Sequence, residues 1–223
     1  MFDNLNFQWN GDGRKKMSYS FNLSKTTLLS LHMQHDIVSP DGKFADFFAE
    51  QAKERHVVQM GNKLLTTARS HNIPIIHVAV CFEPDHSDLH PNAPLLSMVH
   101  QTNALVKGTY GADFIEEVKP LDYELVVKHQ RVGPFQNTNL SELLKENGTE
   151  NVVLFGVATN IVVETTARIA SDEGYNVFVV EDCCSAATME AHKATLQSLS
   201  LLTTITTLEE ITQSFSFVTP SSN

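Results

Sequence analysis

The chain has 223 residues, enough for one α/β domain with a sizeable core and too many for a disulfide-stapled miniprotein. Apolar residues make up 42% of it and charged residues 19%, which is ordinary globular usage and excludes a disordered chain or a coiled coil. The formal net charge of −10 repels phosphate backbones and anionic membranes, so we expect neither nucleic acid nor a membrane as a partner.

The cysteines and the N-terminal residues bear on the cellular compartment. Cys183 and Cys184 are adjacent, where an ordinary disulfide is strained, and Cys81 makes the number of cysteines odd. The N-terminal residues lack the apolar run of a signal peptide, and no segment approaches the roughly 18 apolar residues that span a bilayer. These features predict a cytoplasmic location.

The first half of the chain contains two predicted strands separated by helical sequence. Residues 1–25 are polar and predict a loosely packed N-terminal extension ahead of one domain over residues 26–223. Residues 27–33 are rich in apolar side chains and precede a turn, which indicates a buried strand. Apolar residues then recur with a period near 3.6 over residues 44–70, which predicts one long helix or two joined ones. A second strand is expected over residues 73–82.

The rest of the chain begins with an irregular segment and then becomes regular. Residues 83–120 contain scattered prolines and histidines without a sustained period, so we expect a long connection with short helical pieces. Beyond it, apolar runs alternate with amphipathic segments. The expected strands are 124–128, 152–156, 177–181 and 203–206, and the expected helices are 140–146, 161–173 and 189–201. Strands that alternate with helices predict an α/β fold with a parallel sheet.

In such a sheet, ligands bind at the carboxyl ends of strands, where the winding reverses. The informative residues are therefore expected directly after strands, in residues 32–36, 128–135, 157–164 and 182–185. These are also the segments in which the sequence is least ordinary.

Five stretches of sequence carry a resemblance to a known family. They are LLSLHMQHDIV (28–38), KGTYGADF (107–114), VVKHQRVGPFQNTNLSELL (126–144), VVLFGVATNIVVETTARIA (152–170) and GYNVFVVEDCCSA (174–186). In this order and spacing they resemble the isochorismatase-like superfamily, which includes nicotinamidase-type and N-carbamoyl amide cysteine hydrolases as well as isochorismatases. The resemblance implies a Rossmann-like, three-layer α/β/α fold with a six-stranded, mostly parallel sheet.

The cysteine hydrolases of that family use an Asp, a Lys and a Cys, and the resemblance places His32, Lys128 and Val162 at these positions. Val162 has no lone pair and cannot form a thioester, which excludes the usual acyl-enzyme route. His32 can still exchange protons near neutral pH, and a Lys128 ammonium beside it would lower its pKa. A purely structural, hydrogen-bonded histidine is the alternative for His32.

The position of the family's Lys has two possible occupants. Lys128 lies seven residues before Phe135, one residue more than the family spacing. An inserted residue leaves Lys128 in place, whereas a shift of the loop puts Gln130 there instead. We favour Lys128, because it directly follows the apolar strand residues 125–127.

Other residues are assigned to a ligand, the core or solvent. The expected substrate-binding residues are Gln34, Asp36, Phe135, Ala158 and Thr159. The histidines His77, His86, His90 and His100 match the metal site of some family members only loosely, so we expect no metal and no cofactor. Cys183 and Cys184 are expected to be core residues.

Two functions follow from these assignments. The first is a hydrolase acting on a small amide, carbamoyl or vinyl-ether substrate, with His32 and Lys128 handling protons and water as the nucleophile. The second is a catalytically inactive family member that binds a small molecule or acts as an interaction protein. The resemblance also implies a homodimer or homotetramer.

Overall fold

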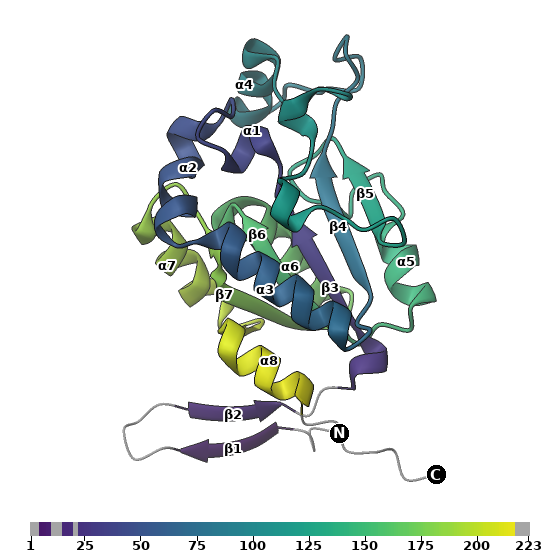
Figure 1. Cartoon of the computed structure of the whole chain (residues 1–223), viewed down its shortest axis with the longest axis vertical. Helices are drawn as coiled ribbons and strands as arrows, with labels where there is room; N and C mark the ends of the chain where they lie inside the picture. Colours follow the sequence, from purple (N-terminus) through teal and green to yellow (C-terminus); the bar gives the residue numbers. More distant parts are fainter. Residues whose placement is uncertain (1–4, 10–14, 20–21, 217–223) are drawn as a thin grey trace.

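The computed structural model describes residues 5–9, 15–19 and 22–216 (Figure 1). Its centre is a sheet of six parallel strands in the order β5-β4-β3-β6-β7-β8. The strands are β3 (Thr26–Leu31), β4 (Ile75–Val80), β5 (Leu125–His129), β6 (Asn151–Val157), β7 (Asn176–Ser185) and β8 (Thr204–Thr206). The predicted α/β fold with a six-stranded sheet is confirmed.

The middle of the sheet is where the winding reverses. β4 and β5 lie on one side of β3, and β6, β7 and β8 lie on the other. Every residue of β3 and β4 is buried, as expected for parallel strands covered on both faces. A residue that directly follows β3, such as His32, therefore lies at the reversal point, where ligands of such sheets bind.

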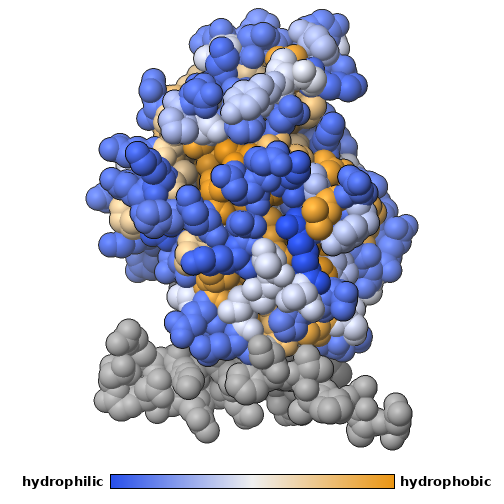
Figure 2. All heavy atoms as spheres, viewed as in Figure 1, coloured by the Kyte–Doolittle hydropathy of each residue, from blue (hydrophilic) through white to orange (hydrophobic). Residues whose placement is uncertain are grey.

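Helices cover both faces of the sheet. Figure 1 shows α3 (Val57–Ser70) and α8 (Leu208–Ser216) side by side in front of the sheet and α6 (Glu164–Asp172) behind it. α7 (Met189–Leu199) contacts α6, and α5 (Leu140–Glu146) is joined to the end of α6 by a hydrogen bond from Ser141 to Glu173. The outer surface in this view is mainly hydrophilic, with hydrophobic residues visible near its centre (Figure 2).

Helix α3 packs on the sheet through an apolar stripe. Its buried residues are Val57, Gly61, Leu64, Leu65 and Ala68. Their spacing follows the helical period, so all of them lie on one face. The stripe explains why the periodic signal in residues 44–70 is strong.

Two predicted segments are more finely divided in the structure. Residues 44–70 form two helices, α2 (Ala45–Glu54) and α3, because His56 between them adopts a left-handed φ of 54°. The connection over residues 83–120 contains the nine-residue helix α4 (Pro94–Thr102), which has proline at its start, and two short 3₁₀ turns, Tyr110–Ala112 and Glu116–Val118.

Some elements have no counterpart among the predicted ones. They are α1 (His35–Val38), α8, the 3₁₀ turn Leu23–Lys25, and the antiparallel pair β1 (Leu5–Trp9) and β2 (Lys15–Tyr19). The β1–β2 pair falls within the predicted extension of residues 1–25. The rest of residues 1–21 lies outside the described residues, so the predicted loose packing of the extension stays a prediction.

The backbones of β3 and β6 approach closely at Gly156, and we expect Gly156→Ala to be strongly destabilising. Gly156 has a φ of +136°, and a Cβ there would lie 2.0 Å from the carbonyl oxygen of Leu31. The variant should lose at least about 4 kcal/mol of unfolding free energy in urea titrations. Gly148→Ala is the control, since Gly148 has a φ of +61° with open space around it, and should cost about 1–2 kcal/mol. Equal losses would contradict the close approach.

Candidate functional site

Two histidines meet at the carboxyl end of the sheet. His32 directly follows β3 in a left-handed conformation with a φ of 56°, and its backbone N–H donates to the carbonyl of Val78 in β4 at 2.9 Å. His129 is the last residue of β5. Their Nε2 atoms are 2.7 Å apart, and the ring centroids are 4.9 Å apart. The two side chains thus form a hydrogen-bonded pair that joins the ends of β3 and β5 across β4.

Both members of this pair are buried and uncharged at neutral pH. Burial lowers the pKa of His32 well below the ordinary value of 6.5, and His129 beside it lowers that pKa further. Burial also lowers the pKa of His129 to about 4, although the backbone of Arg131 acts in the opposite direction. The cost of placing charge in an apolar region therefore keeps the pair neutral.

The structure places the Lys128 side chain on the exposed face of β5, and its catalytic role stays a prediction. Side chains alternate between the two faces of a strand, and in β5 the buried ones are Val127 and His129, whereas Lys128 is exposed. His129 is thus the β5 side chain that contacts His32. Gln130, the alternative for this position, is also directed elsewhere, since its Nε2 donates to the carbonyl of Cys81 at 3.0 Å.

Val162 lies in a single π-helical turn, Thr159–Val163, between β6 and α6. Its side chain is fully buried. The neighbouring Ile161 and Ala158, rather than Val162, line the pocket beside His32. An aliphatic side chain thus stands at the position where the resemblance places the nucleophile.

The three cysteines of the chain do not offer a reactive thiolate. Cys81, Cys183 and Cys184 are buried and free of disulfides. Burial raises the pKa of Cys184 to about 12 and raises that of Cys183 further, so both remain protonated thiols. Burial raises the pKa of Cys81 as well.

Gln34 and Asp36, which are predicted to bind substrate, are hydrogen-bonded to backbone groups of neighbouring segments, and their role in binding stays a prediction. The Gln34 amide donates to the carbonyls of Val80 and Ala112 at 2.8 Å and accepts from the N–H of Val80 at 2.9 Å. The Asp36 carboxylate accepts from the N–H of Leu105 at 2.7 Å and from that of Lys43 at 3.2 Å. The polar atoms of Gln34 and Asp36 thus hold the backbone segments that surround the site in place.

The remaining predicted residues differ in their placement. Ala158 lines the pocket. Thr159 is buried, and its Oγ1 is hydrogen-bonded to Nδ1 of His192 at 2.8 Å. Phe135 is partly buried against the core and is not part of the pocket lining. One of these three predicted residues thus faces the pocket.

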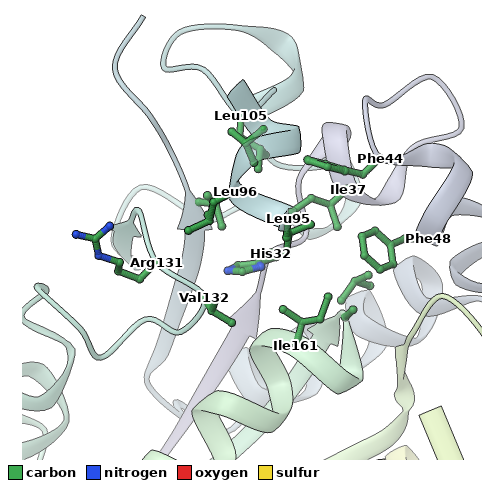
Figure 3. Close-up of a pocket in the computed structure, with 14 residues that line it drawn as sticks. His32, Ile37, Phe44, Phe48, Leu95, Leu96, Leu105, Arg131, Val132 and Ile161 are labelled. Atoms are coloured by element: carbon green, nitrogen blue, oxygen red, sulfur yellow. The ribbon is translucent and has the colours of Figure 1, made fainter. Parts of the chain in front are cut away.

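The pocket beside His32 has an empty volume of about 510 Å³, solvent at its mouth included. His32 and Arg131 are its polar lining residues. The apolar ones are Ile37, Phe44, Phe48, Val80, Leu95, Leu96, Val99, Leu105, Val132, Val157, Ala158 and Ile161. Figure 3 shows His32 among these side chains and the guanidinium of Arg131 directed away from the imidazole. The pocket therefore offers a ligand an apolar surface and one imidazole.

Sequence reasoning missed His129 and the part of the wall contributed by α4. The signal for His129 is the family spacing itself, because His129 lies six residues before Phe135, one residue closer than Lys128. For α4, the signal was the run Pro94-Leu95-Leu96, a proline at the first turn followed by apolar residues.

Metal-ligating side chains are dispersed. No group of three or more His, Cys, Asp or Glu residues in the described part of the chain could hold a metal ion. His86 and His100 have ring centroids 5.2 Å apart, whereas His77 lies elsewhere, with its Nε2 2.9 Å from Oε2 of Glu124. None of the helices in the described residues is long and apolar enough to cross a membrane.

Comparisons with known proteins agree with this architecture. The isochorismatase domain profile matches residues 26–210. The isochorismatase family protein YwoC of Bacillus subtilis is 31% identical over 184 residues, which cover 80% of this chain and 87% of YwoC. The secreted isochorismatase effector Isc1 of Verticillium dahliae is 38% identical over 95 residues, or 41% of this chain and 50% of Isc1. The solved structure of an isochorismatase-like hydrolase from Alkaliphilus metalliredigens has a TM-score of 0.73 and 28% identity, covering 88% of this chain and 99% of that one.

The buried histidine pair predicts that acid destabilises the protein in a defined pH range. Because the folded pKa values lie below 6.5, the unfolded chain binds more protons, and the unfolding free energy falls as the pH drops from about 6.5 toward 4. His129 alone should account for at least about 2 kcal/mol between about pH 7.5 and about pH 4.5. The measurement is urea unfolding at both pH values.

The double variant His32→Asn/His129→Leu is the control for this loss. All other titrating groups, including His77, are shared with the parent and cancel in the difference. The parent should lose at least about 2 kcal/mol more than the variant over the same pH range. Identical pH profiles would mean that the pair is not neutral in the folded state.

Proposed function

The chain belongs to the isochorismatase family, and from this premise we propose that it binds a small, neutral, largely apolar molecule beside His32 without covalent catalysis. The composition of the pocket lining carries this proposal. Of its 14 residues, twelve are apolar, and the other two are His32 and Arg131. No carboxylate, thiol or hydroxyl side chain belongs to the lining formed by the described residues. Such a lining fits a binding pocket better than a site for acyl transfer.

The absence of a suitable nucleophile supports the same proposal. A covalent route needs a lone pair at the attacking position and a base that removes its proton. Val162 offers no lone pair, and the thiols of Cys183 and Cys184 are buried with raised pKa values. The family's thiolate mechanism has no group here to begin it.

The electrostatics of the pocket also favour a neutral ligand. The resemblance implies a charged Asp and a charged Lys near the reacting atom, whereas this chain has His32 and His129, both with lowered pKa values. Lys128 is exposed on the other face of β5. The one charged residue among the described residues of the lining, Arg131, directs its guanidinium away from His32, so burying a ligand's own charge beside His32 would be costly.

Water-mediated hydrolysis is the second candidate function, and the hydrogen bond between the two imidazoles favours it. His129 fixes the orientation of His32, and an uncharged imidazole that lines a pocket can accept a proton from water. The substrate would be a small amide, carbamoyl or vinyl-ether compound. Without covalent catalysis this route is expected to be slow.

Three predictions about the protein as a whole stay predictions. They are its cytoplasmic location, its assembly as a homodimer or homotetramer, and the domain limits of 26–223.

We expect a neutral aromatic probe to stabilise the protein without being converted. Saturating toluene or phenol should raise the Tm by a few degrees, because binding to the folded state alone adds RT ln(1 + [L]/Kd) to its stability. Ile161→Glu places a carboxylate in the lining and should abolish the shift. Leu201→Glu, at an exposed position outside the pocket, should keep it. A shift unaffected by Ile161→Glu would place the ligand elsewhere.

The parent is expected to give no turnover of amides, N-carbamoyl amides or isochorismate. The triple variant His32→Asp/His129→Lys/Val162→Cys introduces the three family groups at the contacting pair His32 and His129 and at the position that the resemblance assigns to the thiol, and serves as a test of scaffold competence. Activity in the triple variant but not in the parent would support the binding function. Turnover in the parent that is lost in His32→Asn would instead establish the water-mediated hydrolase.

A further inference from the structure

The edge strand β5 exposes apolar side chains on both of its faces. It is the outermost strand at one end of the sheet, and in the described part of the chain it pairs with β4 alone (Figure 1). Leu125 is 42% exposed and Val126 is 39% exposed. Because neighbouring strand residues point to opposite faces, a helix lying on one face would cover only one of these two side chains. A strand added at the edge would cover both of them.

The backbone of β5 is also available for pairing at this edge. The carbonyl of His129 accepts from the N–H of Cys81, which directly follows β4, at 3.2 Å, so the backbone polar groups of His129 face β4. These groups point to alternate sides in successive strand residues, and those of Val126 and Lys128 therefore face away from the sheet. A row of outward N–H and C=O groups is a template for pairing with another strand.

The charge around β5 favours a second copy of this chain as the partner. With a net charge of −10, two copies repel each other over most of their surfaces. Residues 121–132, by contrast, contain Asp122 and Glu124 with Lys128 and Arg131, so this segment has no net charge. Five of the nine exposed large hydrophobic residues in the described part of the chain lie in the same segment, namely Leu121, Tyr123, Leu125, Val126 and Val132. Repulsion between copies is therefore weakest where exposed apolar surface is concentrated.

We propose that two copies of this chain associate through β5. A two-fold axis perpendicular to the sheet reverses the direction of the strand, so the two β5 strands pair antiparallel and the two sheets become one continuous sheet. The proposal goes beyond the binding function and does not rest on it, since residues 125–128 are not part of the pocket lining.

The position of the two-fold axis is restricted by the backbone and by charge. An axis at Lys128 places two ammonium groups opposite each other, and one farther along pairs only the end of the strand. An axis before Val127 requires the N–H of Glu124, which already donates to the carbonyl of Leu121 at 2.9 Å. An axis at Val127 instead places Val126 opposite Lys128 of the second copy, and it uses the outward backbone groups of these two residues. The pair occurs twice by symmetry.

This register also extends the contact beyond the five residues of β5. Antiparallel pairing brings the start of one strand beside the end of the other. Tyr123, which is 75% exposed, precedes β5, and Val132, which is 37% exposed, follows it. The segments that carry these two side chains therefore meet at both ends of the paired strands, which adds apolar area to the interface.

Sedimentation equilibrium of the full chain tests the proposal. We expect the parent to show a monomer–dimer equilibrium between about 1 and 100 µM. Val126→Lys places a second ammonium opposite Lys128 in both symmetric pairs, so it should raise the dimer Kd at least about tenfold. Val126→Glu is the matched control, because it places a charge of opposite sign at the same position, and its Kd should stay within about threefold of the parent's.

A charge swap and a remote variant complete the test. Val126→Lys/Lys128→Glu restores two opposite-charge pairs and should return the Kd to that of Val126→Glu. Leu201→Lys, at an 86% exposed position outside residues 121–132, should leave the parent's Kd unchanged. The Tm of each variant confirms that it is folded. A parent that is monomeric over the whole range, or a dimer that Val126→Lys and Val126→Glu weaken equally, would overturn the proposal. Neither result bears on the stabilisation by toluene.

Discussion

A hydrogen bond between two buried, uncharged imidazoles sets the chemistry of this protein's pocket. It joins the ends of β3 and β5, with β4 between them, at the reversal point of the sheet. Because both rings are desolvated, neither can gain a proton cheaply, and each is the partner that the other needs. The pair therefore resists being changed one residue at a time, and it keeps charge away from a wall built mostly from Leu, Val, Ile and Phe side chains.

The resemblance assigns the family's acid and thiol to positions that hold uncharged side chains in this chain. By that resemblance His32 stands at the position of the acid and Val162 at that of the thiol, and the β5 side chain that contacts His32 is His129. Retaining any one charged group alone would leave it buried without a counter-ion, which is costly in an apolar pocket. Under the proposed function, the combined result is a site suited to neutral ligands, on the fold of its family.

The alternation of strands and helices sufficed to predict the sheet, because buried parallel strands leave continuous apolar runs. The face of a short edge strand was harder to predict. Lys128 and His129 are neighbours in sequence, and the alternation of buried side chains in β5 shows that His129 is the one that reaches His32. The six-residue spacing to Phe135 also selects His129. Gln34 and Asp36 are predicted to bind a ligand because they follow a strand, and the structure adds hydrogen bonds to the backbone of Val80, Ala112 and Leu105, which are distant in sequence and which no local pattern reveals.

The residues that hold the loops around the pocket differ from those that line it, and this separation affects how the pocket can change in evolution. Gln34 and Asp36 use their polar atoms to anchor the surrounding loops, while the groups that meet a guest molecule are aliphatic and aromatic. Replacing one apolar lining side chain by another changes the shape of the pocket and leaves the hydrogen bonds of Gln34 and Asp36 in place. Small changes in the volume of the lining side chains can therefore change which ligand the pocket fits. Proteins related to this one could thus differ in the ligands that they recognise while they keep the same fold.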